Sequence, residues 1–258
     1  MREEDTTERD ALTSRVLPKM TLGDGSFSSK TCPPPPMPSH LDATARAALR
    51  FSVKGNAIIT GGTGNLGIEN ARALLEHGLS GLALFDVNPT KPHLAIETLK
   101  ADFPAAKIIT KKVNVTDAGN VQKATEETAA ELGSVDILCC FAGVVGCTHA
   151  IDMTPEEWRK TLDVNTTGSF FCAQAAAKAM ILQGTGGSIV LIASISGHRV
   201  NFPQPQVSYN VSKCGVHHLV RCLAAEWAHY GIRVNSISPG YMDTLLNAVC
   251  QPYEKTAS

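Results

Sequence analysis

Residues 57–67 read Ala57-Ile58-Ile59-Thr60-Gly61-Gly62-Thr63-Gly64-Asn65-Leu66-Gly67, an apolar run that leads into a cluster of glycines. The apolar run predicts a strand over residues 57–60, and the pattern that follows predicts a helix over residues 66–77. Glycine lets the backbone between them turn tightly and come close to a ligand. The free N–H groups at the start of such a helix favour a negative charge, so this turn is a candidate site for a pyrophosphate.

On both sides of this stretch, short apolar runs alternate with amphipathic segments. We expect further strands over residues 81–85, 107–113, 135–141, 188–192 and 232–237, and helices over residues 41–51, 117–132, 154–182 and 207–229. Strands that are apolar on both faces and separated by helices indicate a parallel sheet covered on both sides. The sequence therefore predicts an α/β fold, a doubly wound Rossmann-type sheet that binds ligands at the carboxyl ends of its strands.

Asp86 closes the second predicted strand, 19 residues beyond Gly67. A carboxylate at this place accepts hydrogen bonds from the ribose hydroxyls of NAD and repels the 2′-phosphate of NADP. The alternative interpretation is a turn residue in the segment 86–89, where Asp is common for its own sake. No Arg or Lys stands in residues 61–67 to hold an extra phosphate, and Lys91 is the nearest residue that could do so. We therefore expect NAD rather than NADP.

Tyr209 and Lys213 are four residues apart in a predicted helix, so they share one helical face. A tyrosine with its ordinary pKa of about 10 is a poor acid–base group at neutral pH. A lysine cation beside it stabilises the phenolate and lowers that pKa. The spacing alone is common by chance, so its meaning depends on the surrounding segments.

Together, these segments make the sequence resemble the short-chain dehydrogenase/reductase family over about residues 53–244. In the family's order, the resemblance rests on the glycine turn, Asn114-Val115, Ala142-Gly143, Asn165 in Leu162-Asp163-Val164-Asn165, Ser194, Tyr209 with Lys213, and Pro239-Gly240-Tyr241-Met242-Asp243-Thr244. The resemblance implies an NAD(P)-dependent oxidoreductase that interconverts a secondary alcohol and a ketone. The small-molecule alcohol or ketone is the implied partner, and a homo-oligomer is usual in the family.

The same resemblance assigns catalytic roles. Tyr209 would exchange the alcohol proton, and Lys213 would lower its pKa and hold the nicotinamide ribose. Ser194 would bind the substrate oxygen, although Ser196 is a rival for this role. Asn165 would anchor a water that relays protons to Lys213, or would merely bridge helix and loop.

The cofactor would contact residues at strand ends and helix starts, with Thr244 on the nicotinamide carboxamide. These residues are Gly61, Thr63, Asn65, Leu66, Gly67, Asp86, Asn114, Val115, Ala142, Gly143, Lys213, Pro239, Gly240 and Thr244.

Within the family, residues 193–198 and Tyr209-Asn210 look most like fungal polyol and sugar dehydrogenases, such as those for mannitol or arabinitol. The glycine turn departs from the family's TGxxxGxG, because Asn65 takes a glycine position. The turn also fits the TGxxGxxG of sugar-nucleotide epimerases, which is an alternative for the turn alone. The Asn165 segment and Pro239-Gly240 favour the single-domain oxidoreductases.

Two further departures concern the sheet and the chain end. Cys140-Phe141 replaces two asparagines of the family's pattern, so hydrogen bonds that brace the sheet must come from elsewhere. After Thr244 only residues 245–258 remain, and they resemble neither the family's lid nor its last strand. With both apparently absent, the predicted strand 232–237 becomes an open edge. A truncated, non-catalytic dinucleotide-binding product is therefore the rival interpretation.

Composition limits the remaining classes. A chain of 258 residues with a formal net charge of -1 predicts neither a nucleic-acid partner nor an acidic membrane surface. We expect a disordered tail over residues 1–40, which contains four consecutive prolines, and a single domain over residues 41–258, located in the cytoplasm. The eight cysteines show no metal-like spacing, so we expect no metal site and buried free thiols, including Cys139, Cys140, Cys172, Cys214 and Cys222.

Overall fold

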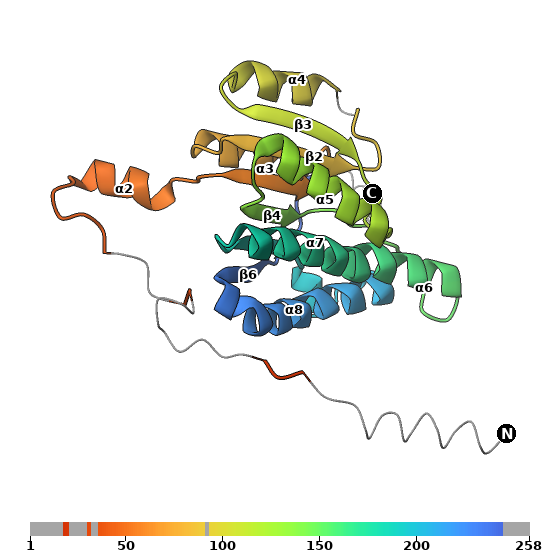
Figure 1. Ribbon diagram of the computed structural model, residues 1–258. Coiled ribbons are helices and arrows are strands. Elements are labelled where there is room, and N and C mark those ends of the chain that lie inside the picture. The colour runs from red at the N-terminus through yellow and green to blue at the C-terminus, as the bar shows by residue number, and fades with distance from the viewer. Residues whose placement is uncertain (1–17, 21–29, 32–35, 91–92, 245–258) are drawn as a thin grey trace.

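The computed structural model describes residues 18–20, 30–31, 36–90 and 93–244 (Figure 1). Most of the expected tail over residues 1–40, the expected departure over residues 245–258, and Lys91 lie outside the described residues. Within the described ranges, no helix combines the length and the apolar character needed to cross a bilayer.

Six parallel strands form the central sheet. They are β1 (Asn56–Thr60), β2 (Gly81–Asp86), β3 (Lys107–Lys112), β4 (Ile137–Cys140), β5 (Gly187–Ile192) and β6 (Ile232–Ile237). Their order in the sheet is β3-β2-β1-β4-β5-β6, and every neighbouring pair is parallel. The order reverses between β1 and β4, and such a switch point opens a crevice at the carboxyl ends of the strands. In the described part of the chain, β6 is an edge strand.

Helices cover both faces of the sheet (Figure 1). They include α3 (Asn65–Glu76), α4 (His93–Asp102), α5 (Ala118–Leu132), α6 (Pro155–Leu162), α7 (Gly168–Gln183) and α8 (Val207–Trp227), whereas α2 (Ala43–Phe51) buries none of its residues and projects away from the sheet. On one face α5, α7 and α8 pack around Ile58, Leu138 and Ile189. On the other face α3 and α4 pack around Ile59 and Leu82. Consecutive β1 side chains therefore pack into two hydrophobic cores, one on each face of the sheet. This confirms the doubly wound fold predicted from strands apolar on both faces.

Two helix ends lie where the sequence predicts them, whereas one predicted helix is interrupted and one observed helix was not predicted. Gly133 closes α5 with a φ of +96°. Thr154 and Glu157 form a capping box in which each side chain accepts from the other's backbone N–H, at 3.2 and 3.1 Å. The single helix predicted over residues 154–182 is instead α6 and α7 joined by a π-helical turn at Asp163–Thr167. The helix α4, which buries Ile96 and Leu99 against the sheet, was not predicted.

The cysteines divide into two groups. Cys139, Cys140 and Cys172 are buried free thiols, as predicted. Burial raises the pKa of Cys139 to about 12, and a hydrogen bond with Cys172, then burial, raises the pKa of Cys140. The prediction is wrong for Cys214 and Cys222, which are exposed on α8 because the apolar face of this helix is supplied by other positions.

Candidate active site

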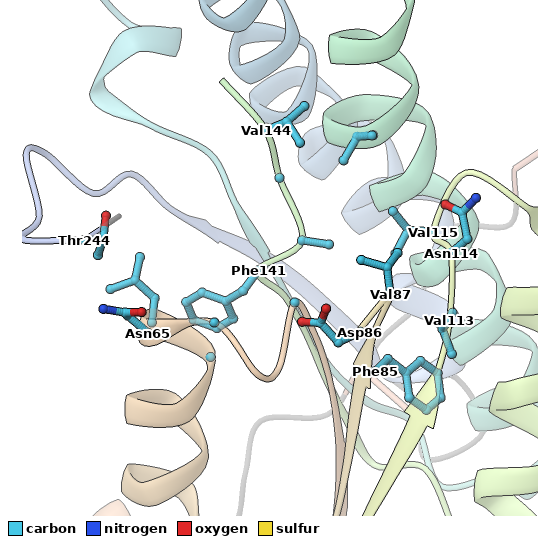
Figure 2. A pocket seen from close by; sticks show the side chains of 17 residues that line it. Asn65, Phe85, Asp86, Val87, Val113, Asn114, Val115, Phe141, Val144 and Thr244 are labelled. Carbon is cyan, nitrogen blue, oxygen red and sulfur yellow. The ribbon is translucent and has the colours of Figure 1, made fainter. Parts of the chain in front are cut away.

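A cavity of about 390 Å³ lies at the carboxyl ends of the strands. Figure 2 shows Asn65 and Thr244 on one side of it, Asp86 and Asn114 on the other, and the ring of Phe141 between them. The predicted cofactor residues that line this cavity are Gly61, Asn65, Leu66, Gly67, Asp86, Asn114, Val115, Ala142, Gly143 and Thr244. Segments far apart in the sequence thus converge where the fold class predicts a ligand.

The glycine turn requires glycine at two of its positions. Gly61 has a φ of +61°, and a Cβ there would lie 2.7 Å from the backbone nitrogen of Ala142. A Cβ on Gly67 would lie 2.4 Å from the carbonyl oxygen of Gly61. The helix α3 starts directly after Gly64, and no side chain caps its first N–H groups. These N–H groups lie at the cavity wall, so a phosphate would find free donors and the positive end of the helix dipole.

Asp86 lies at the end of β2 and also lines the cavity. Its Oδ2 accepts a long hydrogen bond of 3.4 Å from the N–H of Thr63, and its Oδ1 accepts from the N–H of Asn88 at 3.1 Å. Thr63, which was also predicted to bind the cofactor, is buried and does not line the cavity. Among the described residues that line the cavity there is no Arg or Lys.

Tyr209 and Lys213 meet a second cavity of about 90 Å³, which also contacts Ser194, Pro239 and Gly240. Lys213 is 5% exposed, and its Nζ donates to the carbonyl oxygen of Ile192 at 2.6 Å. The same Nζ lies 5.7 Å from the centre of the Tyr209 ring. Burial lowers the pKa of Lys213 to about 8, with the Cys140 thiol acting in the opposite direction. A lysine in this state is a close cationic neighbour for the phenol.

The first and second cavities adjoin each other. Leu66, Phe141, Gly143 and Thr244 line both of them. A Cβ on Gly143 would lie 3.7 Å from Lys213 Nζ, which shows how closely the β4 loop approaches the lysine. The cavity at the glycine turn and the cavity at the Tyr209–Lys213 pair are therefore neighbours at the same edge of the sheet.

Ser194 and Ser196 differ in their positions relative to this pair. The hydroxyl of Ser194 donates to Ser196 Oγ at 3.0 Å and accepts from the Ser196 N–H at 3.1 Å. Ser194 lines the second cavity together with Tyr209 and Lys213, whereas Ser196 lines a third cavity of about 40 Å³. Ser194 is thus the better placed of the two to contact a reacting oxygen near Tyr209.

Asn165 is fully buried in the π-helical turn. Its Oδ1 accepts from the N–H of Val144 at 2.8 Å, and its Nδ2 donates to Val144 O and to Ser212 Oγ, each at 2.9 Å. Both amide hydrogens are therefore used, and the side chain fixes the β4 loop to α8 between Tyr209 and Lys213. The role of water anchor stays a prediction.

The third cavity shares Ser194, Tyr209 and Gly240 with the second one. Its other polar lining residues are Ser196 and Tyr241, which the sequence analysis names, and Asn201, Gln204 and Gln206, which it does not. The hydroxyl of Tyr241 donates to Gln204 Oε1 at 3.0 Å, and Gln206 is 5% exposed with its Nε2 3.4 Å from Cys147 Sγ. Amides and hydroxyls both donate and accept, so this wall suits a ligand with several hydroxyl groups.

A comparison with protein families matches residues 55–254 to the short chain dehydrogenase family. The chain belongs to the short-chain dehydrogenase/reductase family. It is 35% identical to the NADP-dependent mannitol dehydrogenase of Hypocrea jecorina over 214 residues, which cover 82% of this chain and 79% of that one. It is 40% identical to the D-arabinitol 2-dehydrogenase (ribulose-forming) of Scheffersomyces stipitis, over 78% of this chain and 77% of that one.

Among solved structures, the chain is similar to the NADPH-dependent 3-quinuclidinone reductase of Rhodotorula rubra, with a TM-score of 0.73 and 33% identity. That match covers 83% of this chain and 77% of the other. As a member of the short-chain dehydrogenase/reductase family, the protein is an oxidoreductase that uses NAD(P). The family and the fold are those predicted, and neither the epimerase nor the non-catalytic alternative is favoured by these matches.

The sequence reasoning missed the apolar part of the wall of the first cavity in this short-chain dehydrogenase/reductase. Phe85, Val87, Val113, Phe141, Val144 and Val164 line the large cavity as well. Most of them are next to predicted residues at strand ends, and this position in the sequence could have indicated them.

The bracing expected to replace the family's asparagines comes from Thr60. Its carbonyl oxygen accepts from Phe141 N at 2.9 Å, and its Oγ1 accepts from Ala142 N at 3.3 Å.

Proposed function

We propose that this enzyme interconverts a polyol and the corresponding ketose, oxidising one secondary alcohol with NAD(P)⁺. The observation that carries the proposal is the shared wall between the glycine-turn cavity and the cavity of Tyr209 and Lys213. The polyol is favoured by the names of two relatives, the mannitol and arabinitol dehydrogenases, and by the polar third cavity. Amide and hydroxyl groups there can pair with the hydroxyls next to the reacting carbon.

In this proposal each residue has a distinct task. Tyr209 takes the proton of the substrate hydroxyl during oxidation, and the buried cation of Lys213 stabilises the resulting phenolate. Ser194 donates a hydrogen bond to the substrate oxygen, where charge develops. The glycine turn and the start of α3 hold the pyrophosphate, because a Cβ would fill that space and the helix N–H groups are uncapped. The nicotinamide supplies the hydride acceptor when it is bound.

The direct test is a coupled screen of the purified chain with D-mannitol and D-arabinitol, each with NAD⁺ and NADP⁺. Formation of reduced cofactor, together with the matching ketose, is the expected result. Binding of the cofactor without turnover of any polyol would reject the substrate class while leaving the cofactor site intact. A parallel assay with 2-butanol separates a polyol enzyme from one that accepts any secondary alcohol.

We further propose that Asp86 makes the enzyme prefer NAD, although one relative and one structural neighbour bear NADP or NADPH in their names. A 2′-phosphate near the carboxylate would suffer like-charge repulsion, and no described Arg or Lys lines the cavity to offset it. Asp86→Ala should raise the affinity ratio of NADPH over NADH by about tenfold or more, since 1.4 kcal/mol corresponds to a factor of ten. Fluorescence titration of both reduced cofactors measures the ratio.

Asp152→Ala, a change at an exposed carboxylate outside the cavity wall, is the matched control and should leave the ratio unchanged. If wild type already binds NADPH more tightly than NADH, the assigned role of Asp86 is wrong.

Gln206 offers a test of the polyol assignment itself. Gln206→Leu removes the amide from the third cavity and leaves a side chain of similar size, so one neutral hydrogen bond to the substrate is lost. With about 0.5–1.5 kcal/mol for such a bond, kcat/KM for the polyol should fall up to about tenfold. The same variant should turn over 2-butanol at least as well as wild type does, because that alcohol has no second hydroxyl. Equal losses for both alcohols would instead indicate a structural role for Gln206.

A further inference from the structure

Outside the cofactor and substrate cavities, three polar atoms converge where three chain segments meet. His198 follows the 3-10 turn Ile195–Gly197, His217 lies on α8 one turn beyond Lys213, and Ser238 directly follows β6. His198 Nε2 is 3.0 Å from Ser238 Oγ, and Ser238 Oγ is 3.4 Å from His217 Nε2. The two Nε2 atoms also contact each other, so the three atoms form a closed triangle.

The two histidines and the serine have few N–H and O–H protons to share among their three contacts. Two neutral imidazoles that face each other through Nε2 need one N–H and one lone pair, and the serine hydroxyl adds a single proton. Neutral imidazole is the form that binds metals. When both rings carry their proton on Nδ1, the two Nε2 lone pairs face a common centre that solvent can reach, since His198 is exposed.

We infer that His198, His217 and Ser238 form a binding site for a divalent transition-metal ion, with Zn²⁺ as the best match. The two imidazole nitrogens suit borderline ions such as Zn²⁺, the neutral Ser238 hydroxyl is a weaker donor beside them, and water completes the tetrahedron. Zn–N bonds of about 2.0–2.1 Å require the two nitrogens to move somewhat apart, which an exposed ring permits. Arg221 opposes the cation, so the site binds more weakly than a closed structural zinc site.

This inference does not depend on the proposed function. The position of the metal site nevertheless bears on the cavity of Tyr209 and Lys213. The three ligands come from the turn that carries Ser194, the helix that carries Tyr209 and Lys213, and the segment that leads to Pro239. A bound ion therefore links the three segments that form the second cavity. The spacing along the chain conceals the site, because residues 198, 217 and 238 are far apart in sequence.

The test is a Zn²⁺ titration of the untagged, full 258-residue chain against a chromogenic chelator, without substrate or nicotinamide. One ion per chain is expected. His198→Asn and His217→Asn should each weaken the affinity by at least ~10-fold, because even the loss of an outer-shell partner costs that much. His218→Asn, at the exposed neighbouring position on α8, is the matched control and should bind as wild type does. Circular dichroism of each variant checks that the fold is retained.

Among the described residues, the exposed thiols of Cys147, Cys214 and Cys222 are the competing ligands. Co²⁺ in place of Zn²⁺ distinguishes them, because thiolate ligation gives an intense sulfur-to-metal absorption band and imidazole ligation does not. Weak visible bands that disappear in His217→Asn support the inference. A strong thiolate band, unchanged affinity in both histidine variants, or no saturable binding would overturn it.

Discussion

Tyr209→Phe is expected to lower kcat for polyol oxidation by about 10²–10⁴-fold, the usual contribution of a positioned general acid or base. The change removes one oxygen from a ring that lines both the second and the third cavity, beside Lys213 and Ser194. The phenyl ring fills the same space, so NADH affinity and the thermal midpoint of unfolding should remain close to those of wild type. Steady-state assays with the best polyol from the screen, combined with NADH fluorescence, separate the two effects.

Tyr230→Phe is the matched control, because Tyr230 lies beyond α8 and stacks on His229, away from the cavities. It should leave kcat unchanged. Turnover of Tyr209→Phe within about twofold of wild type would show that another group exchanges the proton, and the mechanism proposed above would fail.

The fold was predictable because its signals are local and repeated. Ile58 and Ile59 point to opposite faces of the sheet and enter different cores, and a run apolar at every position requires such an arrangement. Glycines with forced conformations, such as Gly61 and Gly133, marked the turn and the helix end. The helix α4 was not predicted because the amphipathic pattern of its sequence is weak. Ile96 and Leu99 are buried only through contact with the sheet.

The site was predictable only in part, for a similar reason. The family's motif names Ser194, Tyr209 and Lys213, but it does not show that Asn165 uses both amide hydrogens to hold Val144 and Ser212. Such bonds join residues 21 and 47 positions apart, so no local pattern encodes them. The polar third cavity and the contact of His198 with His217 arise in the same way, from segments that meet only after folding.

Lys213→Met is expected to abolish activity and to make the protein without cofactor more stable near pH 7. Burial lowers the pKa of Lys213 from 10.5 to about 8, so the folded state holds an ammonium at an energetic cost. At 1.36 kcal/mol per pKa unit, that cost is about 3 kcal/mol. Methionine fills the space without a charge but leaves the Ile192 carbonyl without its donor, a loss of about 1–3 kcal/mol. We therefore expect a net gain of about 1 kcal/mol in the free energy of unfolding, measured by urea denaturation.

The stability difference between Lys213→Met and wild type should depend on pH in a definite direction. Below about pH 8, Lys213 is protonated in both states, and the full cost is present. Between about 8 and 10.5 the unfolded chain binds the additional proton, so the stability contributed by this position rises with pH in wild type. The advantage of Lys213→Met should therefore shrink across that window, whereas Lys178→Met, at an exposed position of α7, should show no such trend. An advantage that stays constant with pH would mean that Lys213 is not held as a costly buried cation. A result of the expected form would mean that the fold gives up stability to keep a positive charge beside Tyr209, where the proposed proton transfer needs it.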